Sequence, residues 1–310
     1  MPCFYPLPAI QTPGGEILIY SRLNPPLTVA AHIGRHIKLP CGRCIGCKIQ
    51  RSQEWATRCL HESQQYENNC FLTCTISEEH LARAAPGGSL SRSIHQTFLK
   101  RVRARYEHQI RFYMCGEYGE KLKRPHYHYL LFNHTFSDRQ YSHTSESGEK
   151  LYRSEVLEDL WQFGKCWIGD VTYESCAYVA SYVMKKLSGE LAVDHYRRID
   201  EAGNEYWLEP EFNLMSRRPG IGKHWWEQFN QDVINEDVVV RKNGGKMRPP
   251  RYYDKLLELF DSKLMVELKY KRELRAKLLN EDNTPARLEV KELVTKAKLK
   301  IKNRNLEKLK

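Results

Sequence analysis

A pair of histidines separated by one residue is the first feature that could bind a metal ion. Residues 126–132 read His-Tyr-His-Tyr-Leu-Leu-Phe, which predicts a β-strand, and on a strand His126 and His128 share a face. Glu117, at the end of the preceding predicted strand, is the candidate third ligand. Two histidines and a carboxylate leave coordination positions open, as a catalytic ion requires. The alternative is that both histidines lie on a solvated face and bind nothing.

Two tyrosines on one predicted helix could act as nucleophiles. Residues 174–187 contain no Pro or Gly and predict a helix, on which Tyr178 and Tyr182 are one turn apart. A phenol with a pKa of about 10 is a poor nucleophile at neutral pH, so it needs a nearby cation and a phosphate polarised by a metal. Lys185 and Lys186 follow within a turn and are the candidate cations. Tyrosines at this spacing also occur in cores and interfaces, but the combination with metal ligands favours phosphodiester cleavage.

Three cysteines have the spacing of a metal-binding motif. Cys41, Cys44 and Cys47 are each separated by two residues, and a structural zinc ion needs a fourth ligand. Cys3 is the preferred fourth ligand over Cys59, because Cys59 lies well along the following predicted helix. An iron–sulfur cluster, or reduced thiols without a metal, are the alternatives.

The charge balance favours a polyanion as partner. The 310 residues carry a formal net charge of +11, and residues 251–310 contain 17 Lys and Arg against 10 Asp and Glu. A solvated charged face is the alternative. Some basic residues flank the Cys motif and others stand in a Gly-rich segment with tryptophan, where they could contact a DNA backbone. The residues that flank the Cys motif are Arg43, Lys48 and Arg51, and those in the Gly-rich segment are Arg217, Arg218 and Lys223.

The overall composition predicts a soluble globular protein. No run of residues approaches the roughly 18 apolar residues of a membrane span, and residues 1–5 lack the pattern of a signal peptide. The hydrophobic fraction of 41% is enough for a core. In a reducing compartment the ten cysteines are expected to be thiols or metal ligands and not disulfides.

Strands and helices alternate in one order between residues 67 and 190. The predicted strands cover residues 70–75, 110–115, 126–132 and 166–173. Helices are predicted from residue 94, after a break at residues 86–89, from residue 156, and over residues 174–187, with a loop over residues 133–150. The first six elements match a ferredoxin-like β-α-β-β-α-β unit, whose first and third strands are central. We therefore expect an α+β fold with a central antiparallel sheet and the histidine strand in its middle.

Four segments are predicted along the chain. An N-terminal Cys-containing segment covers residues 1–66 and ends in a helix from residue 48, and the α+β core covers residues 67–190. A Gly- and Trp-containing extension follows over residues 191–250. The last segment, residues 251–310, is a basic helical tail that divides near Pro285, with Thr284 as the cap of the final helix.

The motifs together resemble those of the HUH endonucleases. In chain order they are residues 71–75, the His-Tyr-His triplet, and residues 178–186. Two tyrosines separated by three residues resemble the replication initiators of microviruses. Further motifs, at residues 39–47, 115–119, 216–222 and 248–253, look like the gokushovirus branch of these proteins. One departure is Cys74, where a more apolar residue would be expected.

The resemblance implies a rolling-circle replication initiator with an HUH endonuclease fold. It would nick single-stranded DNA at the origin of a circular phage genome through a 5′-phosphotyrosine, and later rejoin the strand. It implies Mg²⁺ or Mn²⁺ at the histidine site, the bacterial cytoplasm as location, and a host helicase and polymerase as partners. A relaxase- or transposase-type HUH protein, or a DNA-binding protein without catalysis, remain the other interpretations.

Overall fold

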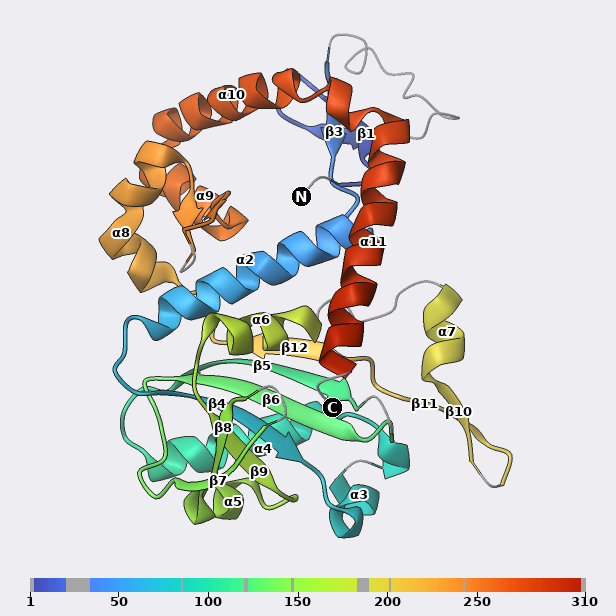
Figure 1. Cartoon of the computed structure of the whole chain (residues 1–310), viewed down its shortest axis with the longest axis vertical. Helices are drawn as coiled ribbons and strands as arrows, with labels where there is room; N and C mark the ends of the chain where they lie inside the picture. The colour runs from blue at the N-terminus through green and yellow to red at the C-terminus, as the bar shows by residue number, and fades with distance from the viewer. Residues whose placement is uncertain are drawn as a thin grey trace. The chain divides into compact units, whose positions relative to one another are not determined.

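The computed structural model describes residues 3–20, 34–84, 86–119, 122–145, 148–182, 190–200, 202–241 and 244–307 (Figure 1). The chain divides into two compact units. The terminal unit comprises Met1–Arg51 and Val266–Lys310, and the central unit comprises Ser52–Met265. No helix in the described ranges is long and apolar enough to cross a membrane.

A seven-stranded sheet with the order β12-β5-β6-β4-β9-β8-β7 organises the central unit. Its inner strands are β4 (Asn69–Thr75), β5 (Arg111–Tyr118), β6 (Pro125–Phe132) and β9 (Cys166–Gly169), and each pair of neighbours is antiparallel. The first and third predicted strands, β4 and β6, lie side by side between the other two. This confirms the predicted ferredoxin-like strand order and the central place of the histidine strand.

Both faces of this sheet are covered. On one face, α4 (Arg92–Arg105) and α5 (Glu155–Trp161) pack with strand residues such as Tyr129 around the fully buried Trp161. On the other face, residues of α2 (Ile45–Ser63) and α6 (Tyr173–Ser181) pack against Tyr113 and Leu130. Figure 1 shows α6 on this side of the sheet. Burial on both faces explains why β5 and β6 carry apolar or aromatic side chains on both of their faces.

Three of the helices that pack on the sheet, α4, α5 and α6, begin after a residue whose side-chain hydroxyl caps the first turn. The Ser91 side chain accepts a hydrogen bond from the Ser93 amide before α4, and Ser154 accepts one from Leu157 before α5. At α6, Thr172 and Ser175 form a reciprocal capping box. Each cap satisfies amides that have no partner in the first turn, so the start of each helix is locally encoded.

The structure corrects two predictions within the core. Residues 133–150 are not a plain loop, because β7 (Gln140–Thr144) and β8 (Lys150–Arg153) form a hairpin that extends the sheet past β9. The last predicted strand ends at Gly169 and not at residue 173. The helix predicted over residues 174–187 is present as far as the structure describes it. An additional helix, α3 (Glu78–Ala84), and a short 3₁₀ turn, η1 (Pro86–Gly88), follow β4.

The remainder of the central unit consists of short elements. β12 (Phe212–Met215) pairs with β5 and extends the sheet on the other edge. The other elements are α7 (Glu190–Tyr196), β10 (Arg197–Ile199), β11 (Glu205–Trp207), α8 (Lys223–Glu236), β13 (Val239–Val240), β14 (Lys246–Met247) and α9 (Arg251–Phe260).

In the described residues, the terminal unit contains a small sheet, the start of α2, most of α10, and α11. Strands β1 (Leu7–Gln11), β2 (Ile17–Ile19) and β3 (Arg35–Leu39) form the order β2-β1-β3. Helix α10 (Ser262–Leu278) is followed by the short turn η3 (Glu281–Asn283) and by α11 (Pro285–Glu307).

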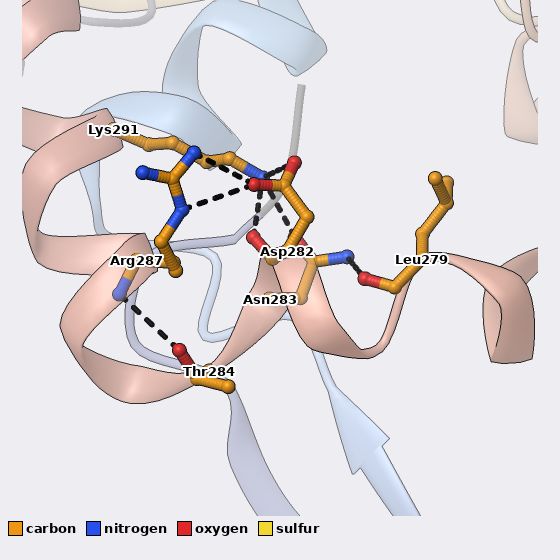
Figure 2. A network of polar contacts seen from close by, with 6 residues as sticks. All are labelled: Leu279, Asp282, Asn283, Thr284, Arg287 and Lys291. Atoms are coloured by element: carbon orange, nitrogen blue, oxygen red, sulfur yellow. Dashed lines mark hydrogen bonds and ion pairs between the residues drawn. The ribbon is translucent and has the colours of Figure 1, made fainter.

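Polar contacts define the turn between α10 and α11 (Figure 2). The Thr284 hydroxyl accepts a hydrogen bond from the Arg287 amide at 3.4 Å. Asp282 accepts hydrogen bonds from the Arg287 guanidinium at 2.9 Å and from the Lys291 ammonium at 2.5 Å. The predicted division of the tail and the cap at Thr284 are therefore confirmed.

Candidate functional site

The hairpin of β5 and β6 brings Glu117 to a histidine. In the strand register Glu117 lies opposite His126, and Cys115 lies opposite His128. The hydrogen bond is nevertheless diagonal, from Nε2 of His128 to Oε1 of Glu117 at 3.0 Å. Both side chains are buried, with exposed fractions of 2% for His128 and 5% for Glu117. A carboxylate and an imidazole therefore meet in a site with little solvent.

The second nitrogen of His128 has its own partner on the neighbouring strand. Nδ1 lies 3.1 Å from the hydroxyl oxygen of Thr73, which is directly opposite His128 in the register of β4 and β6. A hydroxyl can donate or accept, so Thr73 fits either tautomer of His128. When Thr73 accepts from Nδ1, the lone pair of Nε2 is free to bind a cation.

His126 is held in the tautomer that a metal ligand needs. Its Nδ1 lies 2.9 Å from the carbonyl oxygen of Arg124, and because a carbonyl only accepts, Nδ1 must carry the proton. Burial lowers the pKa of His126, which favours the neutral ring with a lone pair on Nε2. Gly119 makes room for the ring, since a Cβ there would lie 2.7 Å from its Cε1 atom.

Glu117, His126 and His128 offer donor atoms that suit a divalent ion, but these atoms lie farther apart than the ligands of one bound ion. The rings of His126 and His128 are nearly parallel, at 7°, with centroids 6.5 Å apart. Ligands at about 2.1 Å from one ion are at most about 4.2 Å apart. Across the described residues, a set of three or more His, Cys, Asp or Glu ligand atoms all within 4.8 Å of one another occurs only in the Cys motif. Binding through Glu117, His126 and His128 thus requires side-chain adjustment.

Both candidate tyrosines, Tyr178 of α6 and Tyr182 at its C-terminal end, contact His128. The ring of Tyr182 stacks on the imidazole, with centroids 5.4 Å apart and planes at 3°, and Tyr178 meets it edge-on at 5.2 Å. Tyr178 and Tyr182 also meet edge to face at 5.0 Å. Phe71 of β4 contacts both His128 and Tyr178 at 6.0 Å. The structure therefore gathers the tyrosine pair and the histidine site on one face of the sheet.

The two tyrosines differ in their surroundings. Tyr178 is 45% exposed, whereas Tyr182 is 4% exposed. Burial, with contributions from Tyr178 and Glu117, raises the pKa of Tyr182 far above its ordinary value. Tyr182 is therefore a neutral phenol in this state. The candidate cations Lys185 and Lys186 lie outside the described residues.

The region that carries this site matches a known protein family. The family model of the replication-associated protein ORF2/G2P matches residues 69–187, which include both histidines and both tyrosines. Replication-associated protein VP4 of Bdellovibrio phage phiMH2K is 32% identical over 91% of this chain and 85% of its own length. This chain belongs to the phage replication-associated proteins. The resemblance to microvirus replication proteins is thereby confirmed.

Other phage replication-associated proteins show the same similarity. Protein ORF2 of Spiroplasma virus 4 is 32% identical over 71% of this chain and 68% of its own length. Protein ORF4 of Chlamydia phage 1 is 27% identical over 78% of this chain and 59% of its own length. No solved structure matches the chain.

The cysteine motif of this replication-associated protein forms a compact cluster with Cys3. The Sγ atoms of Cys3, Cys41, Cys44 and Cys47 all lie within 4.8 Å of one another, so this Cys cluster could hold a metal ion. Cys59 is buried in the core of the central unit and takes no part. All ten cysteines are free thiols, as predicted.

The thiol of Cys44 is polarised by its surroundings. Burial raises its pKa, but backbone amides of Cys47 and Phe4 donate hydrogen bonds to its sulfur and bring the pKa down to about 7. Phe4 and Leu288 pack beside the Cys cluster. The cluster therefore joins the N-terminal residues, the start of α2 and α11 within the terminal unit.

The basic residues predicted to contact DNA belong to different parts of the chain. Arg217 and Arg218 line a cavity of about 470 Å³ together with Arg103, His108 and Arg111. This cavity lies at the start of β5, six residues or about 20 Å along the strand from Glu117. Lys223 forms an ion pair with Glu227 at 3.1 Å. Arg43, Lys48 and Arg51 belong to the terminal unit.

Some residues of the site have roles that their sequence pattern does not reveal. Thr73 stood in a recognised motif, and its partnership with His128 follows from strand register, which the sequence did not supply. Gly119 stood in another motif, and only the position of the His126 ring explains why a glycine is needed there. Away from the site, at the start of β5, Glu62 and Arg111 form a buried ion pair that no sequence spacing indicated.

Proposed function

We propose that this replication-associated protein is a rolling-circle initiator of the HUH type, which nicks and rejoins single-stranded DNA at a phage origin. The observation that carries the proposal is the packing of Tyr178 and Tyr182 against His128, whose Nε2 is bonded to Glu117. The ferredoxin-like strand order supports the HUH fold, and the family supports a role in phage DNA replication.

Glu117, His126 and His128 are the proposed metal ligands. A bound Mg²⁺ or Mn²⁺ ion would supply Lewis-acid polarisation of the scissile phosphate. The chain's own contribution is orientation, since Thr73 and the Arg124 carbonyl fix the two imidazoles through their Nδ1 atoms. The low exposure of Glu117 and His128 limits competing water.

Tyr178 is the proposed nucleophile of the first cut, because it is the accessible member of the pair. Its hydroxyl oxygen forms a bond to phosphorus while the bond from phosphorus to the 3′ oxygen breaks. The phenol releases its proton and the leaving 3′ oxygen takes one up, so no proton is gained or lost. In this proposal Lys185 and Lys186 supply positive charge that favours the phenolate and neutralises phosphate.

Tyr182 is the proposed nucleophile of the second cut. After the 3′ hydroxyl has primed synthesis by a host polymerase, with a host helicase, Tyr182 would cut the regenerated origin. The released 3′ hydroxyl then attacks the first phosphotyrosine, which frees that tyrosine and closes a circle. The phosphodiester bond energy stays in the protein–DNA link, so joining requires no nucleotide cofactor.

The proposal includes contacts away from the site and a second metal. Arg43, Lys48, Arg51, Arg217, Arg218 and Lys223 are proposed to contact the DNA backbone in the cytoplasm of the bacterial host. Zn²⁺ is proposed at the Cys cluster, because four cysteine thiolates are the ligand set of structural zinc sites.

A covalent adduct tests the proposed chemistry. The protein is incubated with single-stranded DNA that contains the origin of the cognate genome, with Mn²⁺ or Mg²⁺, and is run on a denaturing gel. A band of protein bound to DNA should appear, and it should be lost in the Tyr178→Phe, Tyr182→Phe double variant and in His126→Ala. An adduct that survives in the double variant would refute the tyrosine assignment. DNA binding without any adduct would favour a non-catalytic role.

A further inference from the structure

The terminal unit has little apolar core of its own. Among its described residues, the buried apolar side chains are Phe4, Ala9, Ile10, Cys44, Leu268 and Leu288. Its helices leave large apolar side chains in solvent, among them Val266, Tyr270 and Leu278 of α10 and Leu293 of α11. Small units with so few buried side chains usually depend on disulfides, a metal or a partner for stability.

Disulfides are not the source of stability in this unit. All four cysteines of the Cys cluster are free, and the Sγ atoms of Cys3 and Cys44 are 3.8 Å apart, far beyond a disulfide bond of about 2.05 Å. The separation of 3.8 Å instead fits the distance between two sulfurs bound to the same zinc ion. Four sulfurs at about 2.3 Å from one tetrahedral zinc ion are about 3.8 Å from one another.

The surrounding backbone completes the features of a closed metal site. The amides of Cys41, Cys44 and Cys47 donate to the sulfurs of Cys3, Cys41 and Cys44, at 3.2, 3.3 and 3.5 Å. Such donors orient thiolates and balance their negative charge. Four protein ligands leave no position open for a substrate, so the site is structural and not catalytic. The sulfurs are also gathered around one point, which suits a single ion better than a cluster whose irons each take a different thiolate.

We propose that one Zn²⁺ ion at the Cys cluster is what folds the terminal unit, an inference that rests on the Zn²⁺ assigned above. The ion joins Cys3, which precedes β1, to residues 41–47, which follow β3 and begin α2. The Cys cluster in turn packs on Leu288 of α11, so its geometry also holds the C-terminal helix. Loss of the ion releases the small sheet and α11, while the central unit, with its large core of its own, stays folded.

Native mass spectrometry and hydrogen exchange on the full chain test this inference without DNA. Wild-type protein should carry one zinc ion, and Cys44→Ser should carry none. In Cys44→Ser, and in wild-type protein after chelation, amides of β1, β3 and α11 should lose their protection. Amides of β4, β5 and β6 should keep theirs. Re-addition of Zn²⁺, but not of Mg²⁺, should restore protection in the chelated wild-type protein.

Two matched variants separate ligation from general damage to cysteines. Cys47→His keeps a zinc-binding donor and should retain the ion, whereas Cys59→Ala removes a thiol from the central core and should also retain it. Iron in place of zinc, or no metal at all, would overturn the inference. Zinc loss without a change of exchange in the terminal unit would overturn it as well, as would an equal loss of protection in the central unit. None of these outcomes bears on the tyrosine chemistry, which the adduct assay tests separately.

Discussion

Replacing Thr73 by valine tests how the proposed metal ligand His128 is held. The substitution keeps the branched shape that suits a strand but removes the hydroxyl 3.1 Å from Nδ1 of His128. His128 is only 2% exposed, so water cannot readily replace the lost partner. A net hydrogen bond contributes about 0.5–1.5 kcal/mol, and an unpaired buried group costs about 1–3 kcal/mol. At about 1.4 kcal/mol for each factor of ten, Thr73→Val should weaken metal binding roughly tenfold, within the range known for outer-shell partners.

A metal titration of adduct formation measures this effect. The concentration of Mn²⁺ that gives half of the maximal adduct rate should rise roughly tenfold in Thr73→Val. The rate at saturating Mn²⁺ should stay close to that of the wild-type protein, because Thr73 positions a ligand and does not touch the reacting atoms. Thr73→Ser restores the hydroxyl and should return the half-saturating concentration towards the wild-type value.

Two results would refute this account of His128. An unchanged half-saturating concentration in Thr73→Val would mean that the hydroxyl does not hold the ligand. A serine variant as impaired as the valine variant would mean that the effect comes from altered packing and not from the hydrogen bond.

Three further predictions concern the tyrosines, the basic cavity and pH. Tyr178→Phe should abolish the first adduct on an origin oligonucleotide, whereas Tyr182→Phe should still form it. In a replication reaction on the circular genome, Tyr182→Phe should release no closed circles. The Arg217→Ala, Arg218→Ala double variant should bind single-stranded DNA roughly tenfold more weakly at low salt in a fluorescence anisotropy titration, and the slope of log K against log salt should fall by about 1.4. Unfolding by urea at pH 7.5 and pH 5 should show that the central unit loses stability as the pH falls. Burial lowers the pKa of His61 from 6.5 to about 3. As the pH falls, a proton therefore binds His61 in the unfolded chain before it binds His61 in the folded chain. Between pH 6.5 and 5 this difference lowers the free energy of unfolding by about 2 kcal/mol.

Matched controls accompany these predictions. Arg105→Ala with Lys255→Ala removes the same charge from exposed positions outside the cavity and should leave the salt slope near the wild-type value. If this pair lowers the slope as much as the cavity variant, net charge and not the cavity explains binding. For the pH effect, His61→Gln should reduce the loss of stability between pH 7.5 and 5 by about 2 kcal/mol, and the remaining loss comes from other buried histidines such as His95 and His134, whose pKa values burial also lowers. A first adduct in Tyr178→Phe, with none in Tyr182→Phe, would reverse the proposed order of the tyrosines.

The periodicity of strands made much of the site predictable. Side chains alternate along any strand, so the spacing of His126 and His128 was enough to place them on one face, and the order of elements was enough to place their strand centrally. Helical spacing similarly predicted that Tyr178 and Tyr182 are neighbours. These local regularities do not depend on how distant segments meet.

Contacts between distant segments could not be predicted in the same way. Glu117 lies opposite His126 in the register but bonds to His128, which depends on side-chain rotamers across the hairpin. Which tyrosine would be buried depends on the packing of α6 and not on its sequence pattern. The β7–β8 hairpin was missed because most of its side chains are exposed, so its strands carry no apolar alternation.

The buried pair of Glu62 and Arg111 explains why a distant motif belongs with the core. Arg111 donates to the carbonyl of Pro219 at 2.9 Å, and the amide of Gly222 donates to Glu62 at 2.6 Å, so residues 216–222 are held at the start of β5. Gly222 has a φ of 80°, and a Cβ there would lie 2.6 Å from the hydroxyl of Tyr253, which belongs to the motif at residues 248–253. Removing one partner of a buried pair leaves an uncompensated charge and costs about 3–5 kcal/mol. Residues 216–222 thus contact the ion pair directly and lie against Tyr253 at Gly222, and these contacts hold the loop that carries the exposed Arg217 and Arg218.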